Sequence, residues 1–257
     1  MGKVALITGS TSGIGRLIAY KFAKEGISVA ITGFGQESDI VSQLKMLENQ
    51  GVDAKYFFEN LKNGRECKQL VEDVYAHFGR LDILINNAGM QCTAPIDQLP
   101  DEKWEEALSI NLSASFYTIK AALPIMRRQN WGRIINISSV HGFVASVNKT
   151  AYVAAKHGII GLTKGISIET AQENITCNTI CPGYVYTPLM EAQILSKSKE
   201  HHLSFEEEKN RFVSEKHPSR SFVEMQDVAE LAFFLTRDCA KQIRGSSYII
   251  DGGWSSV

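Results

Sequence analysis

Short apolar runs alternate with longer amphipathic segments along almost the whole chain, and this rhythm limits the possible folds more than any other feature. Most of the runs lack polar alternation, as expected for parallel strands covered by helices on both faces. Strands are predicted at Val4–Ile7, Ser28–Thr32, Ala54–Phe58, Ile83–Ile85, Arg133–Ile137, Ile175–Ile180 and Ser247–Ile250. The alternation indicates βαβ units. The sequence therefore predicts an α/β fold with a doubly wound parallel sheet of about seven strands.

Helices are expected in the intervals between these strands. They are predicted at Ile14–Glu25, Asp39–Gln50, Arg65–His77, Lys103–Arg128, Ala151–Gln172 and Met225–Phe234. Pro124 lies inside the fourth helix, where a kink is expected because proline lacks a backbone N–H group. No repeat or Pro/Gly-rich linker divides the sequence, so residues 1–257 are predicted to form one domain.

The segment at about 188–221 is rich in Lys, Glu and His and follows the sixth predicted strand. It can be read as a solvated surface excursion or as a mobile helical lid over a substrate pocket. Its position after the carboxyl end of a strand favours the lid.

Composition excludes several classes of partner. The net charge of -1 arises from 27 basic and 28 acidic residues that are mixed along the chain, so no broad field attracts nucleic acid or an anionic membrane. No apolar run approaches the roughly 20 residues of a membrane span, and the first apolar segment is too short for a signal-peptide core. The five cysteines lack Cys-x-x-Cys spacing, which argues against disulfides and structural zinc. A cytoplasmic location is expected.

No metal site is expected. His201 and His202 are the best candidates for a metal-dependent hydrolase, but adjacent residues rarely face one ligand. A helical His-x-x-x-His partner is also missing from the sequence.

A glycine-rich segment, Thr8-Gly9-Ser10-Thr11-Ser12-Gly13-Ile14-Gly15, joins the first strand to a predicted helix. Glycines at this turn let a pyrophosphate approach backbone N–H groups, and the helix dipole adds to the attraction. A tight turn would account for the glycines alone. The Gly-x-x-x-Gly-x-Gly spacing resembles that of the short-chain dehydrogenase/reductase family, and Asn86-Asn87-Ala88-Gly89 supplies a second family marker after the fourth strand.

Tyr152 and Lys156 are one helical turn apart, so they share one face of a predicted helix. A free phenol has a pKa near ~10, and a neighbouring cation stabilises the phenolate and lowers that pKa. Such a pair also arises by chance on many helices. Ser139 after the fifth strand and Asn111 in the preceding long helix add weight, because all four positions match the family's catalytic set in order and spacing.

The resemblance extends from Thr8 to Asp251-Gly252-Gly253 and implies a Rossmann-like oxidoreductase that is a homotetramer. It implies that Tyr152 takes the proton from a substrate hydroxyl and that Ser139 hydrogen-bonds the reacting oxygen. By the same resemblance, Lys156 holds the nicotinamide ribose and lowers the pKa of the tyrosine, while Asn111 positions a water relay. The family uses its Asn87 equivalent to support the cofactor loop.

NAD is the expected cofactor, although the acidic residue that usually holds the adenine ribose is missing. No Lys or Arg stands at Ser12 or in Gly33-Phe34-Gly35-Gln36 to bind a 2′-phosphate, and Arg16 is a residual candidate for a phosphate contact. Asn60 replaces the family's usual Asp near the adenine amino group. The expected cofactor contacts are Gly9, Thr11, Ser12, Gly13, Ile14, Gly15, Phe34, Asn60, Leu61, Asn87, Ala88, Gly89, Tyr152, Lys156, Pro182, Gly183, Val185 and Thr187.

Polar residues near the predicted centre suit a small carboxylate: Gln91, His141 and Lys149 supply directed hydrogen bonds and a charge. Each alone is more often a solvated loop residue, and His141 could cap a turn. Together they resemble the family members that interconvert (R)-3-hydroxybutyrate and acetoacetate in ketone body metabolism. The expected substrate contacts are Gln91, Ser139, His141, Lys149, Tyr152, Tyr184, Gln193 and Trp254.

Three questions stay open at this point. Tyr184 stands where that subgroup usually carries tryptophan, so a slightly longer 3-hydroxy acid is an alternative substrate. An NADPH-dependent 3-oxoacyl thioester reductase of the same family would need a 2′-phosphate site and a basic patch, and neither is clear. A non-catalytic NAD-binding protein should have lost a catalytic residue, whereas all four are present.

Overall fold

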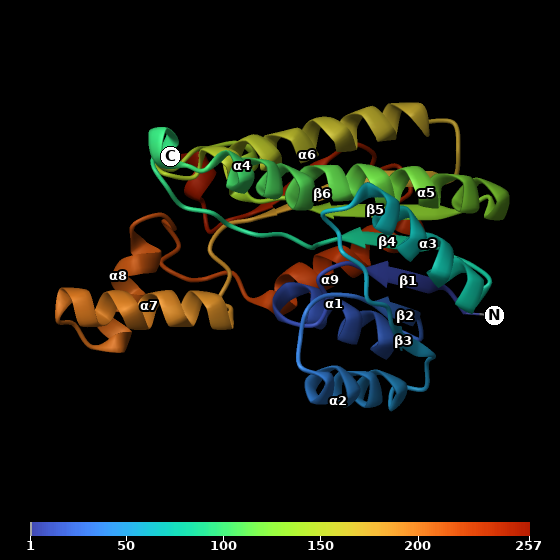
Figure 1. Cartoon of the computed structure of the whole chain (residues 1–257), viewed down its shortest axis with the longest axis horizontal. Helices are drawn as coiled ribbons and strands as arrows, with labels where there is room; N and C mark the ends of the chain where they lie inside the picture. Colours follow the sequence, from blue (N-terminus) through green and yellow to red (C-terminus); the bar gives the residue numbers. More distant parts are fainter. Residues whose placement is uncertain (1) are drawn as a thin grey trace.

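Seven parallel strands form one sheet within residues 2–257, which this computed structural model describes (Figure 1). The strands are β1 (Val4–Ile7), β2 (Ser28–Ile31), β3 (Ala54–Tyr56), β4 (Ile83–Asn86), β5 (Gly132–Ile137), β6 (Ile175–Pro182) and β7 (Ser247–Ile250). Their order in the sheet is β3-β2-β1-β4-β5-β6-β7. The predicted doubly wound α/β fold is confirmed, and each predicted strand is present with its ends shifted by two residues at most.

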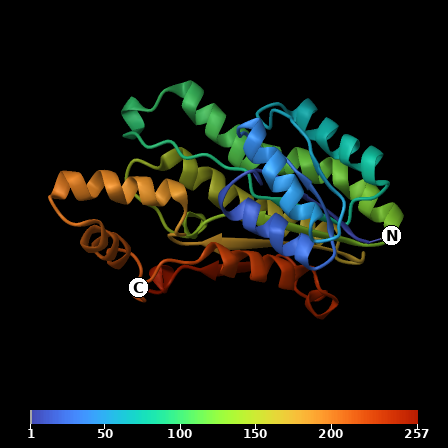
Figure 2. The ribbon, with the colours of Figure 1, turned by 90° about the horizontal axis from the view of Figure 1, so that it is seen from below.

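Helices cover both faces of this sheet (Figure 1, Figure 2). The helices are α1 (Gly13–Lys24), α2 (Glu37–Glu48), α3 (Gly64–Phe78), α4 (Asp101–Leu108), α5 (Ala114–Gln129), α6 (Thr150–Glu169), α7 (Pro188–His201), α8 (Phe205–Ser214) and α9 (Met225–Thr236). On one face α1 packs against α9, and on the other α3 packs against α5 while α6 packs on β6.

Two apolar cores lie on opposite sides of the sheet, because successive side chains of a strand point to opposite faces. In β1, Ile7 joins the core that contains Phe22 of α1, whereas the preceding Leu6 joins the core that contains Leu70 of α3 and Ile119 of α5. Both faces are buried, so the strands carry apolar residues without polar alternation. Because all strands are parallel, their carboxyl ends lie along the same side of the sheet. The loops that follow the strands lie together there.

The fourth predicted helix, Lys103–Arg128, is present as one helical run that contains a π-helical turn, a feature that the sequence did not predict. A π-helical turn at Ser109–Ser113 separates α4 from α5 and contains Asn111. Pro124 lies within α5 and does not end it. Within the π-helical turn the side chain of Asn111 makes hydrogen bonds with the backbone of Met90, which lies on another segment. Such turns often mark functional sites.

The segment at about 188–221 contains two helices, α7 and α8, which lie beyond the carboxyl edge of the sheet (Figure 1, Figure 2). The carboxylate of Glu208, which is fully buried, contacts Nδ1 of His201 at 2.9 Å and the guanidinium of Arg211 at 2.8 Å. These contacts hold α7 and α8 together as one unit. Among residues 2–257, no helix has the length and apolar character needed to cross a membrane.

Candidate active site

The turn between β1 and α1 is pressed against the end of β4. Gly9 has φ of 62°, and a Cβ placed on it would lie 2.8 Å from the Cα of Ala88. Ser12 precedes α1 without capping it through its side chain, so that side chain leaves the first N–H groups of the helix to other acceptors. A close backbone approach and uncapped N–H groups are what a pyrophosphate requires. The residues of this turn therefore fit a dinucleotide.

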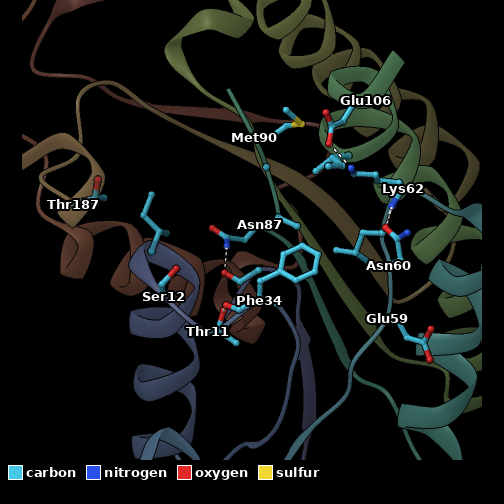
Figure 3. A pocket seen from close by; sticks show the side chains of 17 residues that line it. Thr11, Ser12, Phe34, Glu59, Asn60, Lys62, Asn87, Met90, Glu106 and Thr187 are labelled. Carbon is cyan, nitrogen blue, oxygen red and sulfur yellow. Dashed lines mark hydrogen bonds and ion pairs between the residues drawn. The ribbon is translucent and has the colours of Figure 1, made fainter. Parts of the chain in front are cut away.

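Asn87 fastens this turn to the sheet (Figure 3). Its side-chain amide donates to the carbonyl oxygens of Thr8 and Gly9, both at 3.0 Å. Its own backbone N–H donates to the hydroxyl of Thr8 at 3.0 Å. Gly15 lies against the same amide, because a Cβ there would come within 2.5 Å of Nδ2. Gly15 thus allows the turn to close on Asn87.

A cavity of about 550 Å³ opens above this turn. Its lining includes Gly9, Thr11, Ser12, Ile14, Phe34, Asn60, Leu61, Asn87, Ala88, Gly89 and Thr187, all of them predicted cofactor contacts. Gly13, Gly15, Pro182 and Val185 do not line this cavity. Gly13 and Gly15 shape the turn and α1, Pro182 is the buried end of β6, and Val185 is buried beside Val223.

Six further residues line the same cavity and were missed from the sequence: Gly33, Glu59, Lys62, Met90, Glu106 and Ile110. The sequence carried a signal for Gly33, because this glycine directly follows the second predicted strand. In the structure its φ is 151°, and a Cβ placed on it would lie 2.6 Å from the hydroxyl oxygen of Thr11. The ammonium of Lys62 pairs with Glu106 across the cavity (Figure 3). No sequence pattern links these two residues, since they lie on different elements.

The end of this cavity near β2 is apolar and acidic. Phe34 is 74% exposed and contacts Phe58 edge to face at 6.2 Å between ring centroids. Burial, together with Asp73 and Glu66, raises the pKa of the Glu59 carboxyl. The side-chain oxygen of Asn60 already accepts the backbone N–H of Lys62 at 3.1 Å. Acidic neighbours would repel a 2′-phosphate on the adenine ribose at this end.

Tyr152 and Lys156 project from α6 toward the carboxyl ends of β5 and β6. The ammonium of Lys156 donates to the carbonyl of Ile137 at 2.8 Å, and burial lowers the pKa of this lysine to about 8. Burial raises the pKa of the Tyr152 phenol, while a hydrogen bond with Ser139 opposes that shift. The structure therefore brings the three predicted groups together. The phenol is tuned here mainly by burial and by Ser139.

Asn111 holds the loop after β4 through its side chain. Its side-chain oxygen accepts the N–H of Met90 at 3.0 Å, and its amide donates to the carbonyls of Met90 and Ala107, both at 2.9 Å. A Cβ on Gly89 would lie 2.9 Å from this oxygen and 3.8 Å from the ammonium of Lys156. The amide thus fixes the loop beside Lys156. The predicted water relay stays a prediction.

A buried polar chain supports the strand ends beneath this site. The amide of Asn86 donates to the side-chain oxygen of Asn136 at 2.9 Å, and that of Asn136 donates to the hydroxyl of Thr163 at 2.9 Å. Thr118 donates to Asn86 at 2.7 Å, and Thr179 donates to Thr163 at 2.8 Å. Buried polar groups that are all paired hold one arrangement. This series of hydrogen bonds therefore connects β4, β5 and β6 to α5 and α6.

A second cavity, of about 160 Å³, lies between the strand ends and the helices α7 and α8. It is lined by all eight predicted substrate contacts: Gln91, Ser139, His141, Lys149, Tyr152, Tyr184, Gln193 and Trp254. Thr187 lines both cavities, so the cofactor and substrate sites meet there. The side chain of Thr187 also caps α7 by accepting the N–H of Met190 at 3.2 Å.

Met190 and Phe212 also line this cavity and were missed. The sequence carried a signal for the helix that contains Phe212. Ser204-Phe205-Glu206-Glu207 has the pattern of a capping box, which begins α8 and thereby determines which residues form its apolar face. Gly183, a predicted cofactor contact, lines this second cavity, and its contact with the cofactor stays a prediction. Which face of α8 turns toward the cavity depends on how α7 and α8 pack against the rest of the protein.

His141 is a neutral hydrogen-bonding group in this cavity. Burial, with positive charge at Lys149 and Lys216, lowers the pKa of its imidazole to about 4. Its ring nitrogens contact the hydroxyls of Ser139 at 3.3 Å and Ser146 at 3.0 Å. The structure therefore favours the uncharged form of this imidazole. The cation of the cavity is Lys149, whose pKa is lowered by burial and by Lys197 and Lys216.

Comparisons with known proteins agree with this geometry. The family model described as short chain dehydrogenase matches residues 3–197. A D-beta-hydroxybutyrate dehydrogenase of Cupriavidus necator is 43% identical over 98% of both chains, and one of Rhizobium meliloti is 42% identical over 100% of both. A 3-oxoacyl acyl-carrier-protein reductase of Staphylococcus aureus is 34% identical over 98% of both. A solved actinorhodin polyketide ketoreductase variant with NADPH superposes with a TM-score of 0.91 at 33% identity, covering 100% of this chain and 98% of its own.

Proposed function

Since the chain belongs to the short-chain dehydrogenase family, we propose that it oxidises (R)-3-hydroxybutyrate to acetoacetate reversibly, with NAD as the cofactor. The observation that carries this proposal is the small cavity that places Lys149, His141 and Gln91 on one site with Tyr152 and Ser139. An ammonium and two neutral polar groups suit a carboxylate, and a phenol beside a serine suits a secondary alcohol. The relatives from Cupriavidus necator and Rhizobium meliloti carry a name that agrees with it.

Proton transfer falls to Tyr152 in this proposal. Its phenolate takes the proton of the substrate hydroxyl, and the hydroxyl of Ser139 donates a hydrogen bond to the same oxygen. The nicotinamide dinucleotide, when bound, supplies the acceptor for the hydride that leaves the hydroxyl-bearing carbon. In the reverse direction the phenol returns the proton to the oxygen of the ketone.

Substrate orientation falls to the residues that hold the carboxylate. Lys149 supplies the charge, and Gln91, Gln193 and the neutral imidazole of His141 supply hydrogen bonds of fixed direction. The carboxylate is then held away from the phenol, so that the 3-hydroxyl meets Tyr152. The aromatic rings of Tyr184 and Trp254 form an apolar part of the cavity wall.

Cofactor binding is proposed to use the turn after β1. The N–H groups at the start of α1 would hold the pyrophosphate, Lys156 the nicotinamide ribose, and Thr187 the carboxamide. We propose NAD over NADP because the 2′-phosphate of NADP would need cations around it. At that end of the cavity the lining residues are Phe34 and Glu59, and Phe58 packs against Phe34. The one lysine lining that cavity among residues 2–257, Lys62, is paired with Glu106.

The remaining proposals concern the setting of the enzyme. We propose a cytoplasmic homotetramer that acts in ketone body metabolism, with residues 188–221 as its mobile lid. The five cysteines are all free, which is typical of a reducing compartment. The edge strand β7 exposes Ile249 (42% accessible), which suits a further subunit contact. The mass in solution tests the tetramer.

The deciding experiment measures the absorbance of reduced cofactor when the purified protein receives (R)-3-hydroxybutyrate with NAD or NADP. We expect turnover with the (R) acid and NAD, and little with NADP or with the (S) enantiomer. No turnover of the (R) acid would refute the substrate while leaving the family unchanged. Faster reduction of a 3-oxoacyl thioester with NADPH would instead support the thioester reductase.

A further inference from the structure

His217 occupies a buried position between the lid and the segment that carries Tyr184. It lies three residues after the end of α8 and is fully buried. It is neither a lining residue of the substrate cavity nor a member of the proton-transfer group. Its environment nevertheless involves two residues that do line the cavity, Tyr184 and Trp254.

The hydrogen bonds of His217 define which of its ring nitrogens donates and which accepts. Nδ1 lies 2.7 Å from the carbonyl oxygen of Ser221, which can only accept, so Nδ1 carries the hydrogen. Nε2 is then a lone-pair acceptor, and it accepts the backbone N–H of Tyr184 at 2.9 Å. The imidazole therefore bridges the chain after the lid to the backbone of the cavity wall.

Two glycines make room for this ring. A Cβ on Gly183 would lie 2.5 Å from Nε2 of His217, and a Cβ on Gly252 would lie 2.8 Å from Nδ1. Gly183 begins the segment after β6, and Gly252 belongs to the motif after β7. The imidazole is thus enclosed by three chain segments that meet only in the folded protein.

The ring also sets the orientation of the Tyr184 side chain. The two rings are stacked, with 5.5 Å between centroids and 17° between planes. Tyr184 further contacts Trp254 at 5.0 Å and Phe212 at 4.9 Å, both of which line the cavity. A backbone hydrogen bond and a stacked ring together fix both the main chain and the side chain of one wall residue.

We propose that His217 is a positioning residue that sets where Tyr184 stands, and that it thereby determines which length of 3-hydroxy acid the cavity accepts. The substrate part of this inference rests on the proposed function. The contact between His217 and Tyr184 does not, because it is a property of the free protein. His217 acts through Tyr184 and touches no reacting atom.

Two substitutions separate its two contacts. His217→Phe keeps an aromatic ring for stacking but removes the acceptor for the Tyr184 N–H. His217→Gln keeps an acceptor and a donor but removes the ring. A matched control is His202→Gln, because His202 is exposed at the end of α7.

The first readout is hydrogen exchange of the Tyr184 amide in the free protein. We expect about tenfold faster exchange in His217→Phe than in the wild type, because a buried donor loses its partner. His217→Gln and the control His202→Gln should retain protection. If His217→Phe exchanges at the wild-type rate, His217 does not position Tyr184 and the proposal fails.

The second readout is the ratio of kcat/KM for 3-hydroxyvalerate to that for 3-hydroxybutyrate. We expect both His217 variants to shift this ratio about fivefold toward the longer acid, because a released Tyr184 allows a wider wall. Tyr184→Trp should shift it in the opposite direction. An unchanged ratio in both His217 variants would overturn the role in specificity, and a fall in melting temperature with an unchanged ratio would mean a merely structural role. If the wild type oxidises neither acid, the substrate is refuted and the exchange rates still decide the positioning.

Discussion

The ammonium of Lys156 lies 5.5 Å from the centre of the Tyr152 ring and donates its hydrogen bond of 2.8 Å to the carbonyl of Ile137. The lysine is therefore anchored to the end of β5. The pKa of the Tyr152 phenol depends on burial and on the hydrogen bond with Ser139, so the predicted lowering of that pKa by Lys156 stays a prediction. Burial acts against both charged forms, since it raises the pKa of Tyr152 and lowers that of Lys156 to about 8.

Removing the Tyr152 hydroxyl should stop the reaction without disturbing the fold. We expect Tyr152→Phe to lower kcat by about 1,000-fold, because the general base is lost. The affinity for NAD, measured by fluorescence titration, should stay close to the wild-type value. Retained turnover would refute the assignment of Tyr152 as the base.

The charge of Lys156 should make cofactor binding depend on pH. Because its pKa is about 8, the ammonium loses its proton as the pH rises from about 7 to about 9, and the dissociation constant of NAD should rise over that range. In Lys156→Met the affinity should be lower and independent of pH. An equal pH dependence in the wild type and in Lys156→Met would show that another group is responsible.

The substrate carboxylate should depend on Lys149 for its binding. We expect Lys149→Met to raise KM for (R)-3-hydroxybutyrate by about tenfold to about a hundredfold, because a charge-assisted hydrogen bond is lost. The methyl ester of the same acid is uncharged and serves as the control. If the ester suffers the same loss as the acid, Lys149 does not act through the carboxylate.

His141 should contribute the same hydrogen bonds across the neutral range of pH. With a pKa of about 4 the imidazole stays uncharged from about pH 5.5 to about pH 7.5, so KM for the acid should be level over that range. An imidazole of ordinary pKa would lose its charge there, and KM would rise with pH. His141→Gln should keep the level profile, and a rise of KM in the wild type alone would contradict the neutral form.

Much of this protein could be predicted from local patterns in the chain. The apolar runs and helical periods predicted the strands and their parallel sheet. A strand that is buried on both faces needs apolar side chains at consecutive positions, and such a run is visible in the sequence. The spacing of Gly9, Gly13 and Gly15 and of Tyr152 and Lys156 predicted a dinucleotide turn and a reacting pair. In each case a few residues that are close in sequence determine the local geometry.

Other features depended on contacts between distant segments. The side chain of Asn111 makes hydrogen bonds with the backbone of Met90, and the pairing of Lys62 with Glu106 crosses the cofactor cavity. The neutral form of His141 depends on its burial beside Lys149 and Lys216. The sequence by itself determined the order of the elements and the chemical groups available. Only the tertiary structure decided their protonation and the shape of the cavity, because both depend on which side chains docking brings together and shields from water.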